Sequence, residues 1–332
     1  MPIAKTISVV VIGRNEGERL RACLASVANM HREDFTLELI YVDSNSTDDS
    51  LQIARAAGAR TLTVDTRYPT AGLARNLGWQ AAGSEYILFL DGDTVLDPDF
   101  VRTALPSFAD STIAAVCGNR REARPDRSIY NRVFDLDWNG PAGLVDYCGG
   151  DALFLRCALE LCNGYDPSLI AGEEPDLCRR LRAHSLRVLH MDIPMTLHDL
   201  AITRFSQWWQ RHTRTGYAYA QISERYRNTP IPLWLRESRS NILRAVALTL
   251  LLNLSILCAL ALWSLLPLLF GLLFFASLVQ RTALRARGKG ADVPTRLAYG
   301  VHSHLQQIPI FIGQLNYRTR RRKTRPQLVE YK

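Results

Sequence analysis

The first third of the chain alternates between short β-rich, mostly apolar runs and segments with helical spacing. The apolar runs are residues 7–12, 37–42, 61–64 and 86–90, and the helical segments between them are residues 17–30, 48–58 and 73–83. Near-continuous apolar strands that alternate with helices are typical of a parallel sheet covered by helices on both faces. The pattern therefore predicts an α/β fold with a mostly parallel sheet.

Polar residues follow three of these predicted strands. Asn15 and Glu16 come after the first strand, Asp43 ends the second, and Asp91 and Asp93 follow the fourth. In open parallel sheets, ligands bind outside the carboxyl ends of the strands, where the loops gather. We therefore expect these side chains to converge on one polar site.

The segment DGDTVLDPDF, residues 91–100, carries four carboxylates within ten residues. An EF-hand loop does not fit, because apolar residues occupy its fifth and sixth positions. A turn or helix start at Pro98 accounts for the last two carboxylates. The first two, Asp91 and Asp93, would repel each other at the end of a buried strand unless a cation were present. Because oxygen ligands favour Mg²⁺ or Mn²⁺, this D-x-D pair is expected to hold a metal-bound diphosphate.

A long uncharged segment, residues 245–279, is dominated by Leu, Ala and Phe. As one helix it would be about 52 Å long at ~1.5 Å per residue, against a hydrocarbon core of roughly 30 Å. Two transmembrane helices at about 242–280, joined by a turn near 260–267, fit better. Arginines flank both ends, so the positive-inside rule places both ends in the cytoplasm. The alternative is a buried pair of core helices.

The hydrophobic segment is followed by a polar helix pattern and a basic run. Residues 294–315 are too polar to span a membrane, and RTRRRKTR follows at 318–325. This arrangement predicts an interfacial amphipathic helix with a polybasic tail on anionic lipid. A solvated charge run is the alternative for the tail. The sequence thus predicts a globular domain at 1–235 and a membrane-anchoring region at 236–332.

Composition and charge refine this picture. With 47% hydrophobic and 22% charged residues, the 332-residue chain suits one or two globular domains. The net charge is +8, but residues 281–332 carry +10 (12 basic minus 2 acidic) and the rest −2 (28 minus 30). The tail lacks the interleaved aromatic residues of a base-stacking surface, so nucleic acid is not an expected partner. Seven scattered cysteines without C-x-x-C spacing indicate reduced thiols, not a disulfide framework or a zinc site.

Six segments, in this order, resemble the family 2 glycosyltransferases, which have the GT-A fold. They are VVIGRNEGERL, YVDSNSTDDS, GLARNLGWQAAGSEYILFLDGDT, GGDALFLR, GEEPDLCRRLR and MTLHD. The resemblance covers roughly residues 7–219, and the ordered set is specific although each piece is weak alone. It implies a Rossmann-like sheet flanked by helices and a nucleotide-diphosphate sugar as donor, with a UDP-sugar favoured.

The resemblance also implies roles for the polar residues at the strand ends. Asp43 would hydrogen-bond the nucleotide base, and Asn15 and Glu16 would border the nucleotide pocket. Arg75 would lie near the diphosphate, and Asp91 near the ribose or sugar. For Glu16, a plain role as a first-turn helix acid is the alternative.

The metal site, by the same resemblance, would be formed by two residues far apart in the sequence. Asp93 would be a ligand of Mg²⁺ or Mn²⁺, and His198 would complete the metal or diphosphate site as a neutral imidazole. A histidine satisfied within the core is the alternative for His198.

Inverting sugar transfer also needs a base that takes the proton of the acceptor hydroxyl. The family has a Glu-Asp pair before a helix, and here Glu173 and Glu174 stand at that place. Glu174 replaces the usual Asp, so either residue could be the base. Two acids at a helix start that simply complement the helix dipole are the alternative.

An acceptor motif is less clear. Residues 205–216 resemble the Q-x-x-R-W motif of processive members, but Arg211 is four residues after Gln207 and no Trp follows it. Gln207, Trp208 and Arg211 are the candidates for acceptor contacts, with helix packing as the alternative.

Together these features predict a metal-dependent inverting glycosyltransferase in the inner membrane, with its catalytic domain and both termini facing the cytoplasm. A lipid-linked saccharide is the expected acceptor, as in envelope or exopolysaccharide assembly. The alternatives are an inactive nucleotide-binding GT-A scaffold at the membrane and a sugar nucleotidyltransferase. A sugar nucleotidyltransferase would need a glycine-rich phosphate-binding loop with basic residues after the first strand. The segment VVIGRNEGERL has only one glycine before Arg14, and it has an acid where that chemistry needs basic residues.

Overall fold

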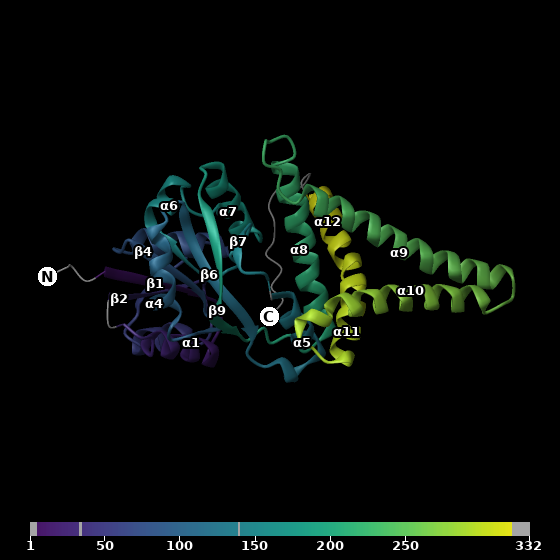
Figure 1. The fold of residues 1–332 in the computed structure, drawn as a ribbon, viewed down its shortest axis with the longest axis horizontal. Helices are drawn as coiled ribbons and strands as arrows, with labels where there is room; N and C mark the ends of the chain where they lie inside the picture. Colours follow the sequence, from purple (N-terminus) through teal and green to yellow (C-terminus); the bar gives the residue numbers. More distant parts are fainter. Residues whose placement is uncertain (1–4, 33–34, 139, 321–332) are drawn as a thin grey trace. The chain divides into compact units, whose positions relative to one another are not determined.

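The computed structural model describes residues 5–32, 35–138 and 140–320. The chain forms two compact units, and Figure 1 labels many of the elements of both. The first unit is Met1–Arg124 with Trp138–Leu200, and the second is Pro125–Asp137 with Ala201–Lys332.

The first unit is built on a sheet that has nine strands among the described residues, in the order β3-β2-β1-β4-β8-β6-β9-β5, with β7 beside β9. The strands are β1 (Lys5–Gly13), β2 (Phe35–Asp43), β3 (Arg60–Thr63), β4 (Tyr86–Asp91), β5 (Thr94–Leu96), β6 (Ile113–Glu122), β7 (Gly143–Val145), β8 (Ala152–Leu155) and β9 (Arg187–His198). The predicted parallel arrangement holds for β3, β2, β1 and β4. Beyond β4 the sheet is mixed, because β8 runs antiparallel to both β4 and β6.

The register of the parallel strands brings the predicted polar loops to one edge. Gly13 at the end of β1 pairs with Asp43 of β2, and Ile12 pairs with Asp91 of β4. The three strands therefore end at the same level. The predicted convergence of their loops is confirmed.

Helices cover the sheet, as the unbroken burial of β1 from Ile7 to Val11 and of β4 from Tyr86 to Leu90 requires. The helices of this unit are α1 (Glu18–Ala28), α2 (Ser50–Ala56), α3 (Ala71–Ala81), α4 (Phe100–Ala104), η1 (Leu105–Ala109), α6 (Arg156–Leu161) and α7 (Glu173–Ala183). At Gly78, α3 lies so close to β1 that a Cβ would be 2.2 Å from Val10 Cγ1. This close packing holds α3 and its polar side chains firmly against the sheet.

The second unit is helical. Its elements are η2 (Pro125–Arg127), α5 (Ile129–Trp138, whose last residue belongs to the first unit), α8 (Phe205–Arg225), α9 (Leu235–Ala261), α10 (Leu266–Arg285), η3 (Ala286–Lys289), α11 (Val293–Leu305) and α12 (Gln307–Arg320). The unit starts earlier than the anchoring region predicted at 236, because α8 packs along α12. The single helix predicted at 294–315 is instead two helices, α11 and α12.

Glycines and buried amides join the helices of this unit. A Cβ on Gly216 of α8 would lie 1.8 Å from the carbonyl oxygen of Ile310, and one on Gly313 of α12 would lie 2.0 Å from that of Thr213. Gln314 Nε2 donates to the carbonyl oxygen and hydroxyl of Ser238 in α9, at 3.0 Å each. The backbones of α8 and α12 are therefore in direct contact, and α9 is hydrogen-bonded to the pair.

The two apolar helices that the sequence predicts are present as α9 and α10, which run side by side in Figure 1. Both are long and apolar enough to cross a membrane, and only 11% of each most hydrophobic window is buried. A pair of core helices would be mostly buried, so this exposure does not favour that alternative. They approach each other where Gly271 faces Ser255. The predicted polybasic tail beyond Arg320 lies outside the described residues.

Candidate active site

Three polar side chains from separate segments meet beyond the end of β4. Asp91 ends this strand, Asp93 follows in the turn to β5, and His198 ends β9, which pairs with β5. One donor atom from each lies within 4.8 Å of the other two, and His198 Nε2 is 3.3 Å from Asp93 Oδ1. Two carboxylates and an imidazole are ligands that suit a divalent cation such as Mn²⁺ or Mg²⁺.

The burial of this group supports its fit to a cation. Asp93 is 4% exposed and His198 is 7% exposed. Among the residues that the structure describes, none forms a hydrogen bond with the buried Nδ1 atom of His198. Buried carboxylates need a compensating positive charge, and a divalent cation would supply it.

A buried arginine links the D-x-D segment to α7. Arg75 of α3 is 2% exposed and donates to Asp91 Oδ1 and to Glu173 Oε1, at 2.7 Å each. Burial alone would lower the pKa of Arg75, but the two carboxylates raise it above its usual value. The guanidinium therefore stays charged and holds two acids from distant segments in fixed positions.

A second buried ion pair, between Asp151 and Arg120, holds the backbone of Asp91 in place. The sequence analysis did not identify this pair. Asp151 is 1% exposed; it accepts the N–H of Asp91 at 2.9 Å, the hydroxyl of Thr196 at 2.9 Å, and lies 3.0 Å from Arg120. Burial raises the pKa of Asp151, and Arg120 opposes that shift. At Gly150 a Cβ would lie 2.6 Å from Asp91 Oδ2. The segment GGD at residues 149–151 is the sequence feature that could have indicated this ion pair.

The residues predicted to border the nucleotide tie the loops after β1 and β2 together. Asp43, 1% exposed, accepts the hydroxyl of Tyr41 at 3.1 Å and the N–H of Ser46 at 2.8 Å. Asn15 donates its N–H to the Ser46 hydroxyl at 2.9 Å and accepts the N–H of Thr47 at 2.7 Å. These bonds shape the predicted nucleotide edge, and the contacts with the nucleotide itself stay predictions.

Another arginine that sequence reasoning did not select lies beside the acidic pair. Arg19 forms a 2.7 Å ion pair with Glu16, and its Nη1 atom is 4.0 Å from Asp93 Oδ2. Glu16 is 7% exposed. The structure thus places Glu16 close to the D-x-D segment through Arg19, which adds positive charge there.

The two adjacent acids that begin α7 have different surroundings. Glu173 is held by Arg75, whereas Glu174 faces two cysteines. The Oε1 atom of Glu174 accepts the N–H of Cys148 at 2.7 Å, the Cys148 thiol at 3.2 Å and the Cys178 thiol at 3.0 Å. Burial raises the pKa of the Glu174 carboxyl, and the donated hydrogen bonds oppose that shift.

The acceptor candidates all lie in the second unit and have structural partners there. Trp208 is 4% exposed, and its indole N–H donates to His302 Nδ1 at 2.9 Å. Gln207 accepts backbone N–H groups at the start of α8, and the Arg211 guanidinium lies 5.1 Å from the centre of the Phe134 ring. Their role in acceptor binding stays a prediction.

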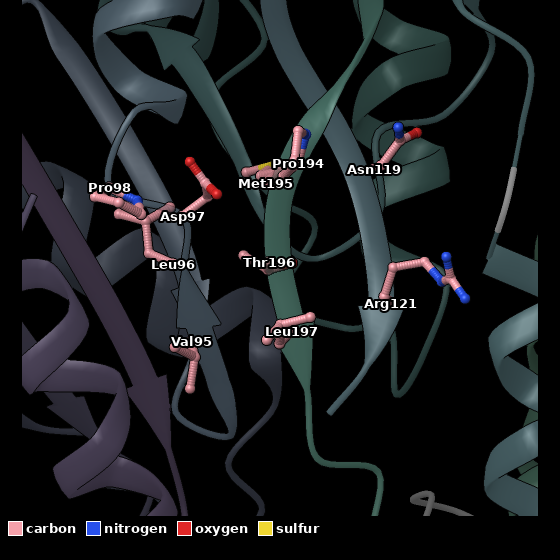
Figure 2. A pocket seen from close by; sticks show the side chains of 10 residues that line it. All are labelled: Val95, Leu96, Asp97, Pro98, Asn119, Arg121, Pro194, Met195, Thr196 and Leu197. Carbon is pink, nitrogen blue, oxygen red and sulfur yellow. The ribbon is translucent and has the colours of Figure 1, made fainter. Parts of the chain in front are cut away.

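A pocket in the first unit is separate from this polar group. Figure 2 shows ten of the described residues around it, from β5, β6, β9 and the turn after β5, and its volume is about 440 Å³. They are Val95, Leu96, Asp97, Pro98, Asn119, Arg121, Pro194, Met195, Thr196 and Leu197. Thr196, which donates to Asp151, is the link to the ion pairs described above. Asp91, Asp93 and His198 are not among the residues that line this pocket.

Comparison with known families places the D-x-D segment in context. Residues 8–158 match the model of the family described as Glycosyl transferase family 2. These residues form a family 2 glycosyltransferase domain. The matched range includes Asp43, Arg75, Asp91, Asp93 and Asp151. The α7 acids and His198 follow the matched range.

Sequence relatives of this family 2 domain include larger proteins. Over 253 residues, the chain is 26% identical to the pre-mycofactocin glycosyltransferase of Mycobacterium tuberculosis, which covers 70% of this chain and 50% of that protein. The chain thus spans about half the length of this relative.

Solved structures share the fold of the family 2 domain. The mannosyltransferase of Pyrobaculum calidifontis, in complex with GDP-Man and Mn²⁺, has a TM-score of 0.60 at 17% identity and covers 95% of this chain and 88% of its own. Glucosyl-3-phosphoglycerate synthase of Mycobacterium tuberculosis, in complex with Mg²⁺ and UDP, has a TM-score of 0.50 at 22% identity, over 67% of this chain and 79% of its own. The predicted GT-A fold is confirmed.

The buried pair of Asp151 and Arg120 yields a stability prediction. Asp151→Ala should lower the free energy of unfolding by about 3 kcal/mol, because it removes the ion-pair partner of Arg120 and leaves the N–H of Asp91 without its acceptor. Asp146→Ala is the matched control, since Asp146 is 69% exposed and lies 3.6 Å from Arg182. Urea unfolding of the detergent-solubilised protein measures both. Equal losses for the two variants would show that the buried pair does not stabilise the site.

Proposed function

We propose that this chain is an inverting glycosyltransferase that moves a sugar from a nucleotide-diphosphate sugar to an acceptor hydroxyl. The observation that carries the proposal is the convergence of Asp91, Asp93 and His198 beside the buried Arg75–Glu173 pair. The family of residues 8–158 supports it, as do fold neighbours solved with a nucleotide or nucleotide sugar and a divalent metal.

Asp91, Asp93 and His198 are the residues that would hold Mg²⁺ or Mn²⁺. When bound, such an ion neutralises charge on the departing diphosphate. The protein's own residues then have positioning roles: Arg75 fixes Asp91 from the side, and Asp151 fixes its backbone N–H. Rigid placement of reacting groups lowers the barrier to transfer.

The donor would lie along the edge formed by the loops after β1 and β2. A carboxylate such as Asp43 can accept from the imide N–H of a uracil base, which favours a UDP-sugar. Asn15 and Glu16 would border the same nucleotide. Arg19 adds a positive charge that favours a diphosphate near Asp93.

We assign the base to Glu174 and a positioning role to Glu173. A general base works best when its pKa approaches the working pH, and burial raises that of Glu174. Glu173, in contrast, is held in an ion pair by Arg75. Glu174 would accept the acceptor's proton while the hydroxyl oxygen attacks the sugar opposite the leaving diphosphate, which inverts the anomeric centre.

The helices α9 and α10 support a further part of the proposal, that the protein is anchored in a membrane. Exposed leucines along both helices and exposed phenylalanines of α10 would be solvated by lipid, and an anchored enzyme suits an acceptor that is itself in the membrane. We therefore propose a lipid-linked saccharide as acceptor, as in envelope or exopolysaccharide assembly, at the cytoplasmic face of the inner membrane. The arginines at both ends of the hairpin support this orientation.

Metal-dependent nucleotide binding is the first test. In titration calorimetry with UDP, GDP and dTDP, one nucleotide should bind at least about tenfold more tightly with Mn²⁺ than without it. Asp93→Ala should remove this dependence because it removes a ligand. Asp99→Ala is the control, since that exposed carboxylate pairs with Arg102 and His31. If no nucleotide shows metal-dependent binding, the glycosyltransferase proposal is wrong.

Substitution of each of the two α7 acids should have a different effect on kcat and on donor binding. Glu174→Gln should lower kcat by about 10²–10⁴-fold and spare nucleotide affinity, because it removes a base but keeps the shape. Glu173→Gln should also weaken donor binding, because it removes a partner of Arg75. Glu160→Gln, at an exposed position, is the control. Full turnover by Glu174→Gln would refute our assignment; nucleotide binding without any wild-type turnover would favour the inactive scaffold.

The anchoring proposal predicts a preference for the lipid-linked form of the acceptor. Wild type should transfer sugar faster to a polyprenyl-linked saccharide in liposomes than to the same saccharide in water. Leu254→Arg with Leu273→Arg should abolish this preference and carbonate-resistant membrane binding, because both positions are exposed and lie well inside the apolar helices, where each arginine costs about 2.5–3.5 kcal/mol. Leu161→Arg, at an equally exposed leucine outside the hairpin, should change neither. Equal wild-type rates on both acceptors would contradict the proposal.

A further inference from the structure

Two thiols and a carboxylate meet at the first turn of α7, outside the Asp91–Asp93–His198 group. The sulfur atoms of Cys148 and Cys178 are 3.6 Å apart, and they lie 3.2 Å and 3.0 Å from Glu174 Oε1. Cys178 is fully buried and Glu174 is 7% exposed. Three possible metal ligands of mixed softness are thus within contact distance of one another.

The local fold holds these donors in place. Glu174 and Cys178 are four residues apart on α7, so their side chains share one face of the helix. Cys148 comes from the segment between β7 and β8, and its N–H bond to Glu174 Oε1, at 2.7 Å, holds that segment against the helix. The cysteine spacing in the sequence did not indicate this group, because its members come from two separate segments.

We propose that Cys148, Glu174 and Cys178 form a second metal site, for a thiophilic d¹⁰ cation of the Zn²⁺ class. Sulfur ligands select Zn²⁺ over Mg²⁺ and Mn²⁺, which prefer oxygen. A tetrahedral ion with bonds of about 2.3 Å to sulfur and about 2.1 Å to oxygen needs sulfur atoms about 3.8 Å apart and sulfur–oxygen distances of about 3.6 Å. The sulfur–sulfur distance already fits, and Glu174 Oε1 would shift by about half an ångström.

The ion would be held by two thiolates and one carboxylate, and a fourth position stays open to water. Binding converts both thiols to thiolates, so two protons are released for each ion bound. The resulting site differs in chemistry from the Asp91–Asp93–His198 group, which offers oxygen and imidazole ligands. One unit therefore carries two cation sites that prefer different metals.

Occupation of the thiol site inhibits transfer. This consequence rests on the proposed role of Glu174 as the base: a carboxylate bound to Zn²⁺ does not accept the acceptor's proton. Mg²⁺ or Mn²⁺ supports turnover from one site, and Zn²⁺ stops it from the other. Extra Mn²⁺ relieves the inhibition poorly, because it does not compete well for sulfur.

The binding test uses Co²⁺ as a spectroscopic probe and Zn²⁺ in competition with a chromogenic chelator. The sample is the full-length, detergent-solubilised protein, kept reduced with a phosphine. Wild type should bind one Co²⁺ with a thiolate-to-cobalt charge-transfer band, and Zn²⁺ should displace it. Cys148→Ser and Cys178→Ser should each weaken the band by at least about half and bind Zn²⁺ at least about tenfold more weakly, because each loses one of the two thiolate ligands. Cys157→Ser, at an exposed cysteine, should match wild type.

Two results overturn the site: no thiolate band in wild type, or a band that persists at full intensity in both Cys148→Ser and Cys178→Ser. Metal-dependent nucleotide binding by each variant reports that it is folded, and Cys178→Ala provides a second form of the same deletion. A folded variant with a weakened band therefore supports the assignment directly.

The inhibition test measures initial rates at fixed Mn²⁺ and rising Zn²⁺, each variant relative to its own rate without Zn²⁺. Cys178→Ser should need at least tenfold more Zn²⁺ for half-inhibition than wild type or Cys157→Ser. Equal sensitivity would place the inhibition at the acidic group and overturn the inhibitory role. A thiolate band in a protein without any transferase activity would uphold the metal site and refute the proposed function instead.

Discussion

The candidate site depends on one buried guanidinium group, that of Arg75. Arg75 joins Asp91, at the end of a central strand, to Glu173, which begins a helix about eighty residues further along the chain. Without a guanidinium between them, carboxylates brought together at a sheet edge would repel each other and resist burial. The guanidinium of Arg75 donates a hydrogen bond to each of the two carboxylates. It also fixes the distance between Asp91 and the acids of α7, so the geometry of the proposed site follows from the packing of α3 on the sheet.

Much of this arrangement could be predicted from the sequence, because it follows from local pattern. The strands β1, β2 and β4 are near-continuous apolar runs, and parallel strands necessarily bring their carboxyl ends together. Strand β5, within the D-x-D segment, was not predicted. Its three residues form a strand only because they pair with β9, a hundred residues later. The ion pair of Arg120 and Asp151 was missed for the same reason: GGD resembles an ordinary turn until its long-range partner is known.

In the C-terminal region, too, local features could be predicted from the sequence and long-range contacts could not. The absence of charge over 245–279 is a local property, and it was sufficient to predict α9 and α10. The partners of α8 are not local. Trp208 lies inside because α11 supplies His302, and nothing in the spacing of aromatic residues along α8 indicates that contact. From the sequence, Trp208 is suited either to acceptor contacts or to helix packing. Its long-range contact with His302 buries it within the helical unit.

If α9 and α10 insert into a bilayer, as proposed above, the contacts of Gly216 and Gly313 between α8 and α12 affect how this unit holds together in two environments. Helices joined by hydrophobic burial separate more easily in lipid, since lipid tails solvate apolar side chains as well as a protein core does. Backbones that touch at Gly216 and Gly313 are held by dispersion forces and close fit, which change little between water and headgroups. The junction can therefore keep one geometry across the boundary between an aqueous phase and a bilayer, where most soluble packing would loosen.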